Sequence, residues 1–284
     1  MAESKDRRLT SRFLVLGLFA FCLAVFSNSA AQRFFSFGTS YTSLVGQPTP
    51  VPQQNAARPG REDEPTPIEE GVMTEKQEKH SKIFKGYRDS TGGKRLKDLI
   101  LNQNEVRVEV PIGDVLAPRG TDLSEYLAAY LKKEVCNSDA IVVGTVTRKS
   151  SQLVDDGTFT FTDYEVNPDE VLRNNSKAPV QTGNSITLTR PGGSVNLKGH
   201  VIRARDRSYD LLSVGHRYLL FLQFVSETGA YQPIYNSVLE DSFELDNGQM
   251  IQVSQKALPF GNSQPRNADS FLGEVRKAVA TVCN

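Results

Sequence analysis

Residues 140–253 alternate apolar and polar side chains with a period of two, and this pattern constrains the fold more than any other feature. Alternation of this kind is typical of strands with one buried face. Turn residues interrupt it, among them Asp156-Gly157 and Asn247-Gly248, the strongest short hairpin signal in the chain. The pattern predicts many short antiparallel strands joined by tight turns.

Two amphipathic helices flank the predicted strands. The first covers residues 122–135, where Asp122 and Glu125 form a capping-box pair ahead of apolar residues at helical spacing. The second follows residue 267, and its apolar face consists of Phe271, Leu272, Val275, Val279 and Val282. This order predicts a mainly β fold with flanking helices. A small curled barrel, packed by an N-terminal and a C-terminal helix, fits it better than a sandwich.

Two irregularities are predicted within the strands. Gly144 lies inside the first long apolar run and can supply a bend or bulge. In the next strand the alternation shifts between Phe161 and Tyr164, which we interpret as a β-bulge near Thr162-Asp163.

The first 31 residues have the order of a secretory signal peptide. A basic start is followed by the apolar run 13–26 and by small residues up to Ala31. The run is short for a membrane span, which needs about 20 apolar residues. We therefore expect a secreted or periplasmic protein. The alternative is a protein anchored in the membrane by residues 13–26.

The remaining chain divides into three parts by composition. Residues 32–93 are rich in proline and charge without sustained periodicity, and we expect a flexible, disordered arm. Residues 94–135 form a connector that ends in the amphipathic helix. Residues 136–284 hold the barrel and the C-terminal helix. Cleavage of the signal leaves Cys136 and Cys283, which in an oxidising compartment most simply form one disulfide; two unpaired thiols are the alternative.

The sequence carries no familiar catalytic, cofactor or metal motif: HExxH, GxSxG, a P-loop and GxGxxG are all missing. Its 33 basic and 33 acidic residues give no net field toward nucleic acid. The most distinctive polar group is a row of arginines at alternate positions, which a strand would place on one face. This candidate anion or glycan contact consists of Arg203, Arg205 and Arg207, with Arg190 as a further member. The alternative is a charged strand balanced by Asp206 and Asp210.

Several blocks between residues 136 and 253 resemble the netrin-type module shared with the tissue inhibitors of metalloproteinases. They are Cys136 to Val146, Tyr164-Glu165-Val166, Val171-Leu172, Gly183-x-x-Ile186, Gly192-Gly193, and Gly215-x-x-Tyr218-Leu219-Leu220-Phe221-Leu222. The chain is similar in the same way to secreted bacterial proteins of unassigned function. The resemblance implies an OB-like barrel, a fold that hosts many unrelated functions.

The inhibitors of that family chelate a protease zinc ion with the free amino group of an N-terminal cysteine. Here Cys136 lies 104 residues beyond Gln32, the expected mature start, so only proteolysis would expose it. We therefore expect an exported, non-enzymatic binding module without cofactor or metal. Its partner would be a protein or a polysaccharide, with no nucleic acid, and with a membrane only if the signal is retained. The alternatives are an enzyme with an unrecognised site and a processed metalloprotease inhibitor.

Overall fold

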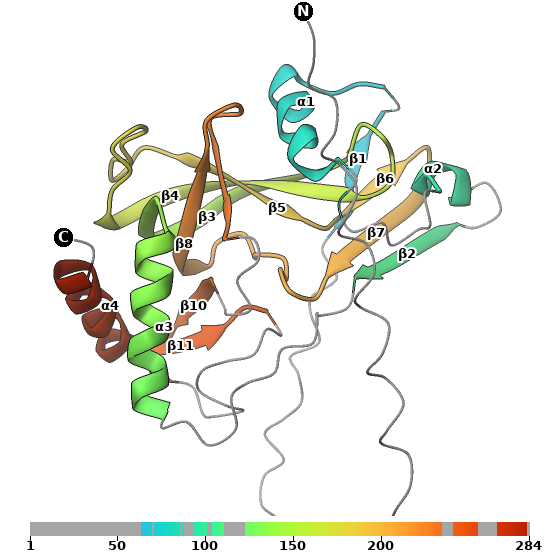
Figure 1. Cartoon of the computed structure of the whole chain (residues 1–284). Helices are drawn as coiled ribbons and strands as arrows, with labels where there is room; N and C mark the ends of the chain where they lie inside the picture. Colours follow the sequence, from blue (N-terminus) through green and yellow to red (C-terminus); the bar gives the residue numbers. More distant parts are fainter. Residues whose placement is uncertain are drawn as a thin grey trace, which may run out of the picture. The chain divides into compact units, whose positions relative to one another are not determined.

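The computed structural model describes residues 64–69, 71–85, 87, 94–100, 104–110, 123–234, 241–254 and 266–282 (Figure 1). The chain divides into two units, Met1–Pro59 and Gly60–Asn284, and every described residue belongs to the second. The predicted signal peptide and the alternative anchor at residues 13–26 therefore lie outside the described residues. Within the described ranges, no helix is both long and apolar enough to cross a membrane.

The fold is mainly β with few helices and a C-terminal helix, as the sequence predicts. The helical elements are α1 (Glu75–Ser81), the short 3-10 helix η1 (Lys82–Phe84), α2 (Leu96–Leu99), α3 (Leu123–Asn137) and α4 (Ala268–Val282). The strands are β1 (Thr66–Ile68), β2 (Glu105–Val110), β3 (Ala140–Leu153), β4 (Thr160–Arg173), β5 (Ile186–Pro191), β6 (Gly193–Leu197), β7 (His200–Asp206), β8 (Arg217–Val225), β9 (Ala230–Pro233), β10 (Ser242–Asp246), β11 (Gln249–Gln252) and β12 (Arg266–Asn267).

Five strands of the larger sheet form a closed ring of pairings. The sheet has the order β12-β11-β10-β8-β3-β4-β5-β9. Its last strand, β9, also pairs with β8, which stands fourth in this order. The ring therefore runs β8-β3-β4-β5-β9. All its pairings are antiparallel except that of β5 with β9, which are parallel and meet at Leu188 and Tyr231.

Alternate side chains of the ring fill two separate cores. One core takes buried residues from all five ring strands, including Val142, Val166 and Leu220, and it occupies the inside of the ring. The second takes the intervening residues of β3 and β8, such as Ile141 and Phe221, and covers them with α3 and α4. These two helices lie side by side (Figure 1). The predicted helical stripes are thus confirmed as packing surfaces for the sheet.

The irregularities differ in part from the prediction. The register of β3 against β4 shifts between Val143 and Gly144, as expected, and a Cβ at Gly144 would lie 2.7 Å from the backbone oxygen of Asn167, so the close approach requires glycine. The bulge predicted near Thr162-Asp163 is wrong: β4 pairs continuously there, and the register shifts instead near Thr147 of β3. Phe161 and Tyr164 are both buried because β4 is covered on both faces, by two different cores.

A second sheet of four strands has the order β1-β6-β7-β2, and its two outer strands pair in parallel with their neighbours. Strand β1 and the helices α1 and η1 belong to residues 32–93, the segment expected to be a flexible arm. That expectation is wrong for residues 64–85. A capping box between Thr74 and Gln77 starts α1, and Phe84 of η1 is fully buried in a core with Phe159 and Phe161. We call residues 64–87 the docked arm.

Candidate functional site

Three of the predicted arginines lie together on the four-stranded sheet. Arg203 and Arg205 belong to β7 and Arg207 follows it, on the face where β2 presents Glu105 and Glu109. Each guanidinium has a carboxylate partner within this region. The pairs are Arg203 with Glu105 at 2.9 Å, Arg205 with Asp210 at 2.7 Å, and Arg207 with Glu109 at 2.6 Å.

The pairs offset most of the charge of the face, but Arg107 of β2 also contacts Glu105 at 3.0 Å, so this carboxylate is shared by two guanidiniums. Hydrogen bonds from Arg107 and Arg203 hold the pKa of Glu105 below its ordinary value, and the hydrogen bond to Asp210 raises the pKa of Arg205. Asp206, the other carboxylate expected to balance the row, is buried and accepts a hydrogen bond from the Tyr87 hydroxyl at 2.9 Å. Strand β2 supplies the carboxylates that the sequence pattern did not identify.

Arg190 lies apart from this row. It belongs to β5 and is fully buried, and its Nη1 donates to Ser242 Oγ at 2.6 Å and lies 3.8 Å from Asp241 Oδ1. The side chain of Arg190 therefore links β5 to the start of β10. A buried link of this kind is a structural contact, so Arg190 does not extend the surface row.

The structure describes one of the two cysteines of the predicted disulfide. Cys136 is exposed and lies in the last turn of α3, directly before β3. Cys283 lies outside the described residues, so the disulfide between them stays a prediction.

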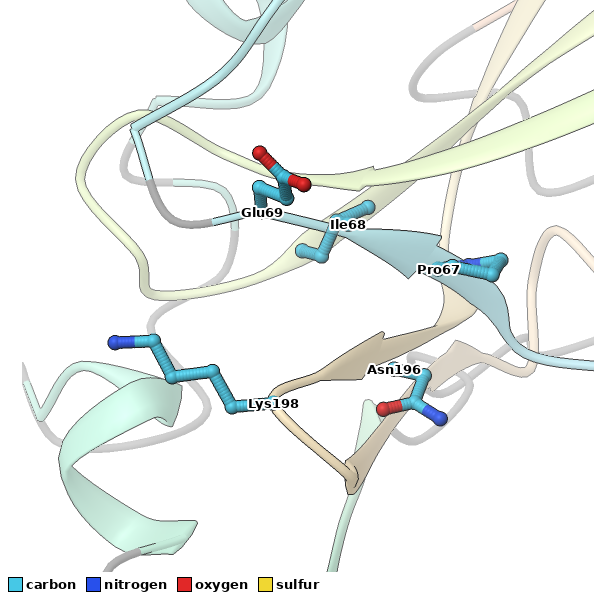
Figure 2. Close-up of a pocket in the computed structure, with 5 residues that line it drawn as sticks. All are labelled: Pro67, Ile68, Glu69, Asn196 and Lys198. Atoms are coloured by element: carbon cyan, nitrogen blue, oxygen red, sulfur yellow. The ribbon is translucent and has the colours of Figure 1, made fainter.

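An open pocket of about 690 Å³ lies where the docked arm meets the four-stranded sheet. Pro67, Ile68 and Glu69 come from β1 and the residue after it, and Asn196 and Lys198 come from β6 and its following turn. Figure 2 shows Glu69 just after the end of β1, with its carboxylate on the side of β1 away from Lys198, which lies at the turn after the neighbouring strand β6.

A two-residue hairpin turn fixes the wall that carries Lys198. Leu197 pairs with His200, so the turn consists of Lys198 and Gly199, and both have positive φ, at 53° and 87°. The side chain of Asn196 accepts a hydrogen bond from the Gly199 backbone nitrogen at 2.9 Å. The turn geometry therefore determines where the lysine side chain starts.

The β1 side of the pocket depends on how the arm is docked. Strand β1 pairs with β6 over three residues, and Thr66 Oγ1 accepts a hydrogen bond from the backbone nitrogen of Ser151 at 3.1 Å. Further along the arm, His80 is fully buried with its Nδ1 2.8 Å from Asp163 Oδ2, and Ser81 Oγ accepts from the Asp155 nitrogen at 2.7 Å. These contacts hold the arm against the hairpin of β3 and β4.

The sequence pattern did not identify this pocket. Three of its five lining residues stand in the segment that composition assigned to a flexible arm. Two signals could have shown that the segment folds: Thr74 and Gln77 at capping-box spacing, and Ile83-Phe84 as an apolar pair among charged residues.

No family model matches the chain, and no curated protein matches it significantly. With no such match, the class of protein is described from its fold and surface alone. It is a mainly β protein with a ring of five strands, two helices over one side of the ring, and an open surface pocket formed partly by an N-terminal arm.

Proposed function

We propose that this protein is an exported, non-enzymatic binding module and that its ring of five strands is an OB-like barrel. An OB-fold is a barrel of five strands, and the ring here has the same number. The blocks that resemble the netrin-type module also fall largely on ring strands, with Ile141 to Val146 in β3 and Tyr218 to Leu222 in β8. The resemblance and the topology thus support the same fold.

The observation that carries the binding function is the contrast between the ring interior and the arm pocket. Side chains from all five strands fill the ring, so its inside is a packed core. The pocket at β1 and β6 is open to solvent and is lined by apolar, amide and charged side chains. A ligand approaching from outside meets this pocket without any rearrangement of the ring.

The placement of Cys136 supports a binding module over a metalloprotease inhibitor. Inhibition through its amino group would require removal of residues 32–135, which include nearly all of α3. That helix contributes Tyr130, Leu131 and Val135 to the core that covers β3 and β8. Such a cut would also remove the docked arm and β2, so the processed chain would lose parts of three cores.

The intact mass of the protein purified from its native host tests the proposal. We expect a chain that starts near Gln32 and gains two alkyl groups only when reduction precedes alkylation. A chain that starts at Cys136 would instead support the processed inhibitor. Retention of Met1 on a protein found in the cytosol would overturn export.

A further inference from the structure

We infer that one edge of the buried Arg190 guanidinium is a binding site for a small planar oxyanion of the carboxylate or bicarbonate type. The inference goes beyond the proposed binding function, because it concerns the interior of the ring and not the arm pocket. It depends on where Arg190 lies, on which of its atoms have no partner, and on how its charge is compensated.

Arg190 belongs to the face of β5 that points into the ring. It stands two residues after Leu188, whose side chain is part of the core inside the ring, and alternate residues of a strand share one face. Ser242, which accepts its hydrogen bond, pairs across the ladder with Leu220 of the same core. The side chain of Arg190 is fully buried. Its guanidinium therefore borders the ring interior, where water does not replace missing partners from outside.

The guanidinium has one occupied side and one open edge. Its Nη1 donates a hydrogen bond to Ser242 Oγ at 2.6 Å. Its Nε and Nη2 are buried and have no hydrogen-bond partner. The N–H bonds of Nε and Nη2 point in the same direction, and together they form the fork that donates to both oxygens of a carboxylate or a similar planar anion. The unpartnered atoms thus make up one complete bidentate site.

The positive charge of Arg190 is compensated only indirectly. The carboxylate of Asp241 lies 3.8 Å from Nη1, beyond hydrogen-bonding distance, and it accepts a hydrogen bond from Ser242 Oγ at 2.8 Å. The serine hydroxyl therefore links the cation to the carboxylate. A buried cation is stable when hydrogen bonds and opposite charge replace the water that it loses. An oxyanion on the open edge supplies both, and the guanidinium separates it from Asp241.

The surroundings also limit the charge and size of the ligand. Asp241 already contributes one negative charge to the site, so we expect a monovalent anion and not a divalent one. No part of the Arg190 side chain is exposed, so the ligand has to be small enough to be enclosed. Formate and bicarbonate have the planar pair of oxygens, the single charge and the small size that this edge requires.

NMR titration of the full mature chain tests the inference through the Nε–Hε signals of its arginine side chains. We expect the Arg190 signal, identified by its loss in Arg190→Lys, to shift with sodium formate and to saturate. Chloride at equal ionic strength should leave it in place, because a spherical ion does not match the fork. Benzoate carries the same carboxylate on a ring too large for an enclosed site, and it should also have no effect. A titration with bicarbonate compares the inorganic source of such an anion with the organic one, and saturation by either supports the site.

Urea unfolding in two salts provides a second measurement. An anion with a Kd of about 10 mM, present at about 0.1 M, lowers the unfolding equilibrium constant about tenfold. We expect this difference between sodium formate and sodium chloride in the wild type. Arg190→Lys keeps the positive charge but replaces the fork with a single ammonium group, so the difference should vanish. The matched control is Arg205→Lys at the surface pair with Asp210, where the difference should remain.

The inference is overturned if the Arg190 signal responds to neither oxyanion, if chloride acts as strongly as formate, or if Arg190→Lys keeps the formate effect. A shift that grows linearly with formate and is equal at Arg205 would also overturn it, because it shows only non-specific ionic contact. If Arg190→Lys does not fold, the wild-type titration decides the matter, since signals that do not saturate exclude the site. None of these outcomes bears on export, which the mass measurement decides separately.

Discussion

Replacing Phe84 with alanine tests whether the arm is part of the folded protein. The Phe84 ring is fully buried, stacked on Phe161 with centroids 5.6 Å apart and edge-on to Tyr87 at 5.7 Å. Removing a buried phenylalanine side chain costs about 3–5 kcal/mol, because apolar burial is lost and a cavity remains. With an m value of about 3 kcal/mol per molar urea, the unfolding midpoint should fall by about 1–2 M.

The matched control for this prediction is Val72→Ala on the same arm. Val72 is 60% exposed, so its truncation should change the free energy of unfolding by less than about 0.5 kcal/mol. Amide hydrogen exchange of residues 71–85 provides a second measurement, and exchange there should become faster in Phe84→Ala than in Val72→Ala. Equal midpoints and equal exchange in the two variants would refute the packing of the arm.

Three further predictions concern the ring and its surroundings. Gly193→Ala should destabilise the fold by more than about 2 kcal/mol in urea unfolding, because its Cβ would collide with two buried hydroxyls. Gly183→Ala, also at positive φ but in open space, should cost only about 1 kcal/mol, and equal costs would contradict the clash. Burial raises the pKa of Tyr218 to about 12, against about 10 in the unfolded chain. The folded state therefore holds this proton more tightly, and the resulting stability is complete below pH 10 and is lost as the pH rises toward 12. Unfolding measured over this range should show a steeper loss in the wild type than in Tyr218→Phe, and parallel curves would count against the assignment. Arg190→Met removes the cation beside fully buried Asp241 and should cost about 3–5 kcal/mol in chemical unfolding. The double variant with Asp241→Asn should recover part of this loss, and no recovery would argue against a coupled pair.

The sequence predicted the elements that depend on local patterning. Alternation of apolar and polar residues identified the strands after Ala140, and helical spacing identified α3 and α4. The Asn247-Gly248 turn also forms as predicted, with both residues at positive φ. Each of these signals lies within a few residues of the structure that it specifies, so a single sequence is enough to find it.

The features that were missed depend on contacts between distant segments. The charge partners of Arg203 and Arg207 stand 98 residues away in β2, and no spacing rule connects them. A bulge was predicted in β4 because apolar residues occur on both faces of this strand, with Phe161 on one face and Tyr164 on the other. The face with Phe161 is buried because Phe84, far earlier in the chain, covers it. Composition also suggested that residues 32–93 are flexible. The few apolar residues of the docked arm pack against residues far away in the sequence, and composition does not show such contacts.

The arm pocket follows from the same long-range contacts. Its β1 wall consists of a three-residue strand that contains a proline, which forms too few backbone hydrogen bonds to fix its own position. The position is instead set by Phe84 and His80, which anchor the arm at a distance from the pocket. The pocket therefore exists only while the arm is docked, because the arm supplies three of its five lining residues. Phe84→Ala should therefore also make amide hydrogen exchange at Ile68 and Glu69 faster, although Phe84 does not line the pocket. If exchange becomes faster at residues 75–84 in this variant but stays unchanged at Ile68 and Glu69, the position of β1 does not depend on Phe84.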